Sequence, residues 1–184
     1  MTKQELRRYI KGLRNGMSGE QIQQYSGAVC AGLESVPQFR NAAVIAFFWP
    51  LKGEVDLRSL IGKCLTDGKT VLLPAVVGPS SLELRRYSGP ECLECGNFGV
   101  MEPVGKAYMG KVDFVVVPGL AFDATGARIG YGKGYYDHLL EKHTESFAAG
   151  VCFDAMVVEN VPTEPHDRRM HVVVTENKVL EITK

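Results

Sequence analysis

Three almost continuous apolar segments constrain the fold of this 184-residue chain more than any other feature. They are residues 42–49 (AAVIAFFW), 70–77 (TVLLPAVV) and 112–117 (VDFVVV). A strand with one solvent-facing side alternates apolar and polar residues, whereas a strand covered on both sides reads as an apolar run. All three runs are too short to span a bilayer as helices. They therefore predict buried strands of a mostly parallel sheet flanked by helices.

Helical patterns lie between these strands. Leu6, Ile10 and Leu13 share one face of a helix predicted over residues 3–13, and Ser18 followed by Gln21 is a capping box that opens a second helix ending near Pro37. Further elements are predicted as helices over 56–65 and 134–143, strands over 81–87, 147–153 and 171–175, and a loop-rich segment over 90–110. Alternating strands and helices indicate an α/β fold. We expect residues 1–184 to form a single three-layer domain with the N-terminal helical pair docked on the sheet.

Charge and cysteine content exclude several classes of protein. The chain has 21 basic and 21 acidic residues, which argues against general affinity for nucleic acid or for an anionic membrane. Residues 1–17 lack the apolar core of a signal peptide, and the five cysteines are odd in number and scattered. We expect a cytoplasmic protein with reduced thiols. Cys92 and Cys95 form a single C-x-x-C, which without a second pair favours incidental cysteines over a zinc site.

The segment most suited to chemistry is 115–137, VVVPGLAFDATGARIGYGKGYYD. It reads as strand, loop and helix, the place where ligands bind in α/β sheets. Four of its residues are glycines that let the backbone turn and approach a ligand closely: Gly126, Gly130, Gly132 and Gly134. Backbone N–H groups before a helix bind anions, Arg128 and Lys133 add positive charge, and Asp137 could hold a metal beside bound phosphates. The segment therefore predicts an anion site.

Two standard phosphate-binding motifs do not match this segment. A Walker A loop fails because Ala127 replaces its first glycine and Gly134 its Ser or Thr, and a dinucleotide fingerprint fails at Tyr135. A glycine-rich turn without a ligand is the remaining alternative. The convergence of glycines, two cations and a carboxylate favours the anion site over that alternative.

At this point the sequence resembles a known family. GLAFDATGARIGYGKGYYD resembles the signature of the 5-formyltetrahydrofolate cyclo-ligase, or methenyltetrahydrofolate synthetase, family. KQELRR, GEVDL, GNFGVMEP and EPHDRRMHVVVTE follow the family's order, so the resemblance covers nearly the whole chain. It implies an ATP- and Mg²⁺-dependent enzyme that converts 5-formyltetrahydrofolate to 5,10-methenyltetrahydrofolate, with release of ADP and phosphate. The implied route is phosphorylation of the formyl oxygen, attack by N10 and loss of phosphate, with no protein nucleophile.

The resemblance also implies roles for individual residues. The implied ATP ligands are Lys3, Arg7, Arg128, Gly130, Tyr131, Gly132, Lys133, Gly134, Tyr135 and Tyr136, with Lys133 and Arg128 also catalytic. The implied folate ligands are Trp49, Glu54, Phe98 and Tyr136, and the implied metal ligands are Asp137 and Asp167. The sequence departs from the family at Tyr131, where Arg or Gly is frequent, and at His171, where many members have Asp. We expect His166 to be structural or to form a hydrogen bond, and Phe47 and Phe48 to be core residues.

Structural alternatives stand beside these roles. Lys3 and Arg7 could be a solvated helix end, the two Asp residues could be capping or turn carboxylates, and Trp49 and Tyr136 could be core aromatics. At the level of the whole chain, the alternatives are a sugar-phosphate isomerase that needs no ATP and a non-catalytic phosphate-sensing module. The expected partner is a reduced folate, with or without a polyglutamate tail, bound by a monomer or weak dimer, with neither nucleic acid nor membrane involved.

Overall fold

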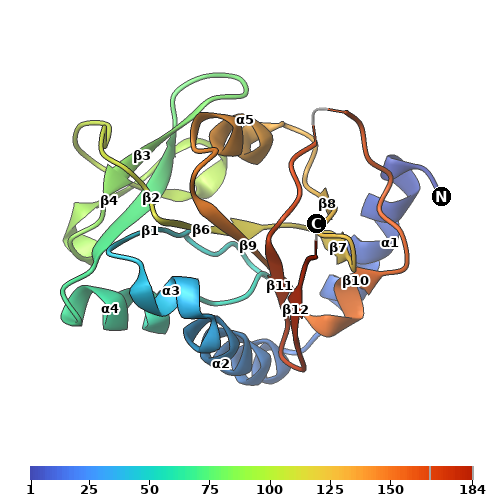
Figure 1. Ribbon diagram of the computed structural model, residues 1–184. Helices are drawn as coiled ribbons and strands as arrows, with labels where there is room; N and C mark the ends of the chain where they lie inside the picture. The colour runs from blue at the N-terminus through green and yellow to red at the C-terminus, as the bar shows by residue number, and fades with distance from the viewer. Residues whose placement is uncertain (166, 184) are drawn as a thin grey trace.

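The computed structural model describes residues 1–165 and 167–183 and is built around a seven-stranded sheet (Figure 1). The strand order is β12-β11-β9-β6-β1-β2-β3. Every pairing from β11 to β2 is parallel, and one antiparallel strand closes each edge, β12 on one side and β3 on the other. The predicted mostly parallel sheet is confirmed, and the strand predicted over 81–87 does lie at an edge.

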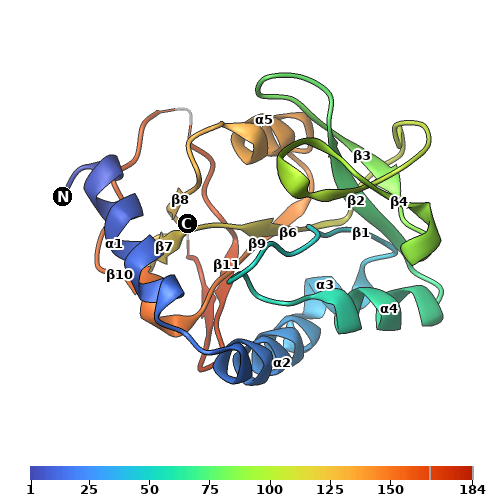
Figure 2. The ribbon, with the colours of Figure 1, turned by 180° about the vertical axis from the view of Figure 1, so that it is seen from behind.

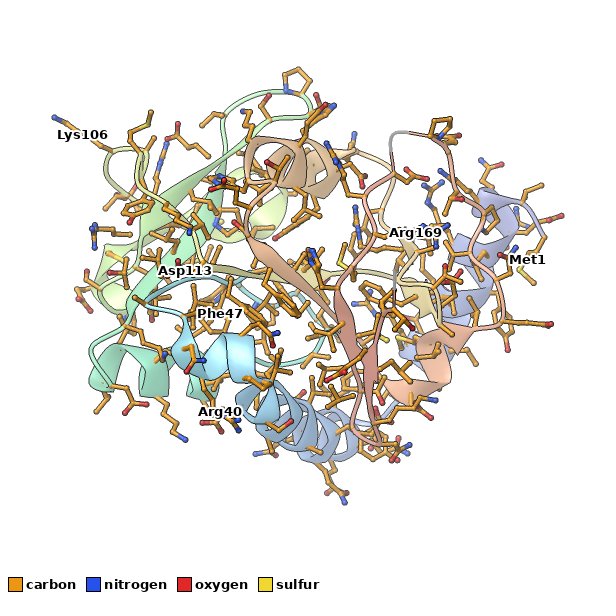
Figure 3. All side chains as sticks on the ribbon, viewed as in Figure 1. Met1, Arg40, Phe47, Lys106, Asp113 and Arg169 are labelled. Atoms are coloured by element: carbon orange, nitrogen blue, oxygen red, sulfur yellow. The ribbon has the colours of Figure 1, made fainter. Side chains whose placement is uncertain are left out.

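β1, β2 and β6 fall on the three apolar runs, β3, β9 and β11 fall on the other predicted strands, and β12 was not predicted. Their bounds are β1 Val44–Ala46, β2 Thr70–Val76, β3 Leu82–Arg86, β6 Phe114–Pro118, β9 Phe147–Val151, β11 Val172–Val174 and β12 Val179–Glu181. All five residues of β6 are buried, as expected for a strand covered on both sides. Asp113 is the polar residue that interrupts the apolar run 112–117. Its carboxylate accepts the N–H groups of Ala43 and Val44 and joins the starts of β6 and β1 (Figure 3).

Helices cover both faces of the sheet. Their bounds are α1 Lys3–Asn15, α2 Gly19–Ser35, α3 Pro37–Asn41, α4 Arg58–Thr66 and α5 Tyr135–Lys142. Figures 1 and 2 show α2, α3 and α4 on one face and α5 on the other. Both halves of the predicted capping box at Ser18 are present, and Pro37 begins a separate short helix. Phe47 packs edge-on against Phe39 of α3 inside this layer (Figure 3), so its predicted core role is confirmed.

The two N-terminal helices occupy different places. Whereas α2 contacts β11 of the main sheet, α1 lies beside a small three-stranded sheet, order β10-β7-β8. The strands of that sheet are β7 Ala121–Asp123, β8 Arg128–Ile129 and β10 Val157–Val158, and a separate hairpin is formed by β4 Leu93–Cys95 and β5 Met101–Pro103. These strands were not predicted, because no long apolar run or clear alternation marks them in the sequence. No helix in the described ranges is both long and apolar enough to cross a bilayer.

Candidate functional site

A cavity of about 380 Å³ opens at the carboxyl ends of the parallel strands. Phe48 and Trp49 follow β1, Val76 ends β2 and Pro118 ends β6, and all four side chains line the cavity. This is the edge where open α/β sheets bind ligands. The structure brings every residue named above as an ATP, folate or metal ligand to its wall: Lys3, Arg7, Trp49, Glu54, Phe98, Arg128, Gly130, Tyr131, Gly132, Lys133, Gly134, Tyr135, Tyr136, Asp137 and Asp167.

Much of the wall is apolar and was not predicted from the sequence. The additional lining residues are Phe48, Leu51, Pro74, Val76, Leu82, Val100, Glu102, Pro118 and Ile129. Phe48 is buried, as its core assignment requires, and it also faces the cavity. Its place near the carboxyl end of the strand predicted over 42–49 could have indicated a cavity-facing residue. Trp49 packs against Tyr87, with ring centroids 5.7 Å apart, which supports one flat face of the wall.

The glycine-rich loop connects β8 to α5, and it passes between α1 and α5 (Figures 1 and 2). Gly132 and Gly134 have φ of 98° and 71°, a region that other residues rarely adopt. Gly134 precedes α5 and provides no side-chain cap, so the first N–H groups of the helix can bind an anion. At Gly130 a Cβ would lie 2.7 Å from Nη1 of Arg128, so glycine there makes room for the guanidinium.

Gly126 belongs to a different feature, and its predicted place in the anion site is wrong. Its φ is 77°, and its N–H donates to the Asp123 carbonyl in the turn between β7 and β8. The buried Asp123 carboxylate holds that turn by accepting the N–H groups of Thr125 and Ala127. An added Cβ on Gly126 would lie 2.7 Å from the Met170 carbonyl oxygen. This glycine therefore serves close backbone packing, not ligand binding.

The predicted phosphate-binding cations pair with the predicted metal-binding carboxylates. Nζ of Lys3 donates to Asp167 at 2.8 Å and lies 3.3 Å from Glu164, and Nη2 of Arg128 donates to Asp137 at 2.9 Å. Burial alone would lower the pKa of Lys3, but its hydrogen bonds to the two carboxylates outweigh that effect and raise the pKa. Opposite charges thus line the cavity in pairs.

A magnesium ion fits this donor set. Within the described ranges, no group of three or more His, Cys, Asp or Glu side chains is placed to hold a metal. Mg²⁺ usually needs only one or two protein carboxylates, because phosphate oxygens and waters complete its octahedron. Asp137 and Asp167 both line the cavity and meet that requirement.

Arg128 is the cation that most clearly suits a bound anion. Its side chain is only 6% exposed, and its guanidinium lies 5.9 Å from the ring centroid of Tyr136. Its Nε is buried and has no hydrogen-bond partner among the described residues. A buried N–H of a charged group is costly to leave unsatisfied. Burial also raises the pKa of Tyr136, so that hydroxyl stays a proton donor at neutral pH.

Lys133 and Phe98 meet at the mouth of the cavity. Nζ of Lys133 lies 5.8 Å from the ring centroid of Phe98, which is 71% exposed. In the described part of the chain, Phe98 is the one residue other than glycine with positive φ, at 62°. Such a conformation is strained for a bulky residue, and strain of this kind concentrates at ligand sites.

Arg14 does not line the cavity but contacts its wall through Tyr131, and this contact was not predicted from the sequence. Its guanidinium donates to the Tyr131 hydroxyl oxygen at 2.5 Å, and the Tyr131 hydroxyl donates to Glu54 at 2.7 Å. Lys3, Arg7 and Arg14 fall on one helical face, and this spacing could have indicated that Arg14 lies near the other two cations.

Arg7 itself donates to the Gly130 carbonyl at 2.9 Å. Neither Lys3 nor Arg7 is a purely solvated side chain, because each binds a different segment of the cavity wall.

Two histidines were singled out in the sequence, His166 and His171. His171 does not line the cavity. Its Nδ1 accepts the Ala148 N–H at 2.9 Å and its ring stacks on Phe147, with centroids 4.8 Å apart, so it joins β9 to the start of β11. His166 lies outside the described residues, and its expected structural or hydrogen-bonding role stays a prediction.

Comparison with known proteins shows the family of the chain. The model of the 5-formyltetrahydrofolate cyclo-ligase family matches residues 1–176. The chain belongs to this family. The matched range includes every residue of the cavity wall, from Lys3 to Asp167. The resemblance first seen in the glycine-rich signature is therefore confirmed at the level of the family.

Individual relatives agree over almost the full chain. The chain is 28% identical to a 5-formyltetrahydrofolate cyclo-ligase of Escherichia coli strain K12, over 94% of this chain and 99% of that protein. It is 26% identical to a probable 5-formyltetrahydrofolate cyclo-ligase of Schizosaccharomyces pombe, over 98% of each. An NMR structure of Aquifex aeolicus 5,10-methenyltetrahydrofolate synthetase superposes with a TM-score of 0.87 at 39% identity, covering 100% of this chain and 94% of that one.

Proposed function

We propose that this chain catalyses the ATP-dependent cyclisation of 5-formyltetrahydrofolate to 5,10-methenyltetrahydrofolate, with release of ADP and phosphate. Family membership and the named synthetase of similar structure support the reaction class. The observation that carries the proposal is that one cavity is lined both by the basic glycine-rich loop and by a set of apolar and aromatic side chains. We also propose that residues 1–184 act as one cyclo-ligase domain, as a cytoplasmic monomer or weak dimer.

The basic part of the wall suits the ATP phosphates. Lys3, Arg7, Arg128 and Lys133 line it together with Gly130, Gly132 and Gly134. Positively charged groups beside a transferring phosphoryl stabilise the charge that it carries. The unsatisfied Nε of Arg128 and the uncapped start of α5 are donors suited to phosphate oxygens. Asp137 and Asp167 would hold a magnesium ion, which when bound neutralises phosphate charge and orients the phosphates.

The apolar part of the wall suits the folate. Trp49, Phe98 and Tyr136 offer flat faces to the pterin and benzoyl rings. Glu54 is 9% exposed and could accept hydrogen bonds from the amino and N–H edge of the pterin, as charge-assisted pairs of this kind are strong. Its carboxylate already accepts the Leu51 N–H and the Tyr131 hydroxyl, which fix its orientation.

The proposed chemistry needs no protein nucleophile. The formyl oxygen attacks the terminal phosphorus of ATP, and the bond from that phosphorus to the bridging oxygen breaks to release ADP. N10 then attacks the activated formyl carbon, loses its proton and closes the ring, while the carbon–oxygen bond breaks and the former formyl oxygen leaves in inorganic phosphate. Lys133 and Arg128 stabilise the transferring phosphoryl, and the cavity walls hold the two substrates in line.

A product assay tests the proposal directly. The full chain is incubated with 5-formyltetrahydrofolate, ATP and Mg²⁺, and the near-ultraviolet absorption of the methenyl product is followed alongside ADP release. We expect both signals, in equal amounts and only when all components are present. Folded protein that gives neither signal would refute the function. ATP-independent turnover of a sugar phosphate would favour an isomerase, and nucleotide binding without turnover would favour a phosphate-sensing module.

A further inference from the structure

Arg14, which has no part in the proposed reaction, connects two walls of the cavity. Its Nε donates to the Gly53 carbonyl at 3.0 Å and its Nη2 to the Lys52 carbonyl at 3.2 Å. Its Nη1 donates to the Tyr131 hydroxyl oxygen at 2.5 Å. The two carbonyls immediately precede Glu54, whereas Tyr131 lies in the glycine-rich loop. One guanidinium therefore ties α1 to both segments.

The hydroxyl of Tyr131 extends this connection to Glu54. It donates its single proton to Oε1 of Glu54 at 2.7 Å, so its oxygen is left to accept the hydrogen bond from Arg14. Although Tyr131 as a whole is 45% exposed, desolvation around its hydroxyl, followed by the nearby Glu54 charge, raises the pKa of Tyr131 to about 12, so the hydroxyl keeps its proton at neutral pH. Oε2 of Glu54 accepts the Leu51 N–H at 2.9 Å, which holds the carboxylate from a second side.

We infer that Arg14 is a positioning residue that, through Tyr131, fixes Glu54 against the glycine-rich loop. The inference rests on the proposed function, in which Glu54 binds the folate and the loop binds the ATP phosphates. A planar guanidinium presents several donors in a fixed fork, so it can serve three acceptors at once, which a lysine ammonium on a flexible stem cannot reproduce in the same geometry. Helix α1 thereby sets the spacing between the two substrate-binding segments.

Steady-state kinetics separate this role from a general structural one. Arg14→Ala and Tyr131→Phe should each raise KM for 5-formyltetrahydrofolate about 5- to 20-fold, the loss expected for a partly buried hydrogen bond to a charged group. KM for ATP should rise less than KM for the folate, because the phosphate-binding cations are retained. In the double variant, KM for 5-formyltetrahydrofolate should be no higher than in the more impaired of the two single variants, since both changes break the same connection. Arg14→Lys should stay impaired.

Arg8→Ala is the matched control, because Arg8 is an exposed arginine on the same helix. It should leave both KM values unchanged. Two results would overturn the inference. One is an increase in folate KM in the double variant that equals the product of the two single increases, and the other is an unchanged folate KM in Arg14→Ala.

Hydrogen exchange measured by mass spectrometry gives a second readout that needs no turnover. In the full chain without ligands, Arg14→Ala and Tyr131→Phe should both speed backbone exchange in peptides covering 51–54 and 129–134, by at least about fivefold. Arg8→Ala should not. Unchanged exchange in either peptide would overturn the inference. If the wild-type chain shows no ATP-dependent turnover, the proposed function fails, whereas faster exchange in both peptides still supports the connection made by Arg14.

Discussion

The Arg128 guanidinium donates a hydrogen bond to the Asp137 carboxylate at 2.9 Å, although the two residues have different proposed partners in the reaction. Arg128 belongs to β8, and its Nη1 lies close to Gly130 of the cavity wall. Asp137 lies in the first turn of α5. Their pairing lowers the cost of burying a cation in the wall before any phosphate arrives. A charged cavity can therefore be built in advance of its ligands.

Removing the Lys133 ammonium should impair turnover much more than folate binding. Lys133 lines the cavity beside the glycine-rich loop, and a cation that acts on the transferring phosphoryl contributes mainly in the transition state. We expect Lys133→Ala to lower kcat about 100-fold or more, with a small change in the dissociation constant of the folate measured by fluorescence. Lys142→Ala, an exposed change at the end of α5, is the control. Wild-type kcat in Lys133→Ala would exclude the role.

Asp137→Asn should raise the magnesium concentration needed for half-maximal rate. The amide keeps the size of the side chain and an oxygen for Nη2 of Arg128, but it loses the negative charge that a hard divalent cation prefers. An increase of about tenfold or more is expected in a magnesium titration at saturating ATP. Glu141→Gln removes a carboxylate from the exposed face of the same helix and should leave the titration unchanged. A normal titration for Asp137→Asn would place the metal elsewhere.

Gly126→Ala should destabilise the fold more than Gly68→Ala does. Both glycines have nearly the same positive φ, 77° and 78°, so the backbone strain of an alanine is matched. A Cβ at Gly68 meets no atom within 4 Å, whereas one at Gly126 would lie 2.7 Å from a backbone carbonyl oxygen. We expect a loss of about 1 kcal/mol for Gly68→Ala and at least about 2 kcal/mol for Gly126→Ala in urea unfolding. Equal losses would contradict the packing role.

The cysteines should differ sharply in reactivity. Burial raises the pKa of Cys30 and Cys64 to about 11 and raises that of Cys152 further, so at pH 8 these thiols stay protonated and shielded. Cys95 is exposed. Mass spectrometry after brief alkylation of the folded chain should find Cys95 labelled first, with Cys152 labelled only after unfolding. Early labelling of Cys152 would show that the segment after β9 opens readily.

Much of the fold could be predicted because its signals are local. The apolar runs of β1, β2 and β6, the capping box at Ser18 and the periodic face of α1 each occupy a few consecutive residues. The hairpins β4–β5 and β7–β8 could not be predicted, because neither a long apolar run nor a clear alternation marks their strands. Gly126 shows the same limit, since its need for glycine comes from Met170, which is distant in the sequence.

The candidate site, like the fold, was only partly predictable from the sequence. Sequence by itself determined that a glycine-rich loop with Arg128 and Lys133 follows a buried strand, because these features are contiguous and the loop's chemistry depends on its own backbone. It also carried the family resemblance. The tertiary structure decided what surrounds that loop: the pairing of Lys3 with Asp167, the apolar wall formed by the ends of β1 and β2, and the hold of Arg14 on Tyr131 and the residues before Glu54. These contacts join segments far apart in the chain, and such contacts depend on sheet order and helix placement, which local residue patterns do not encode.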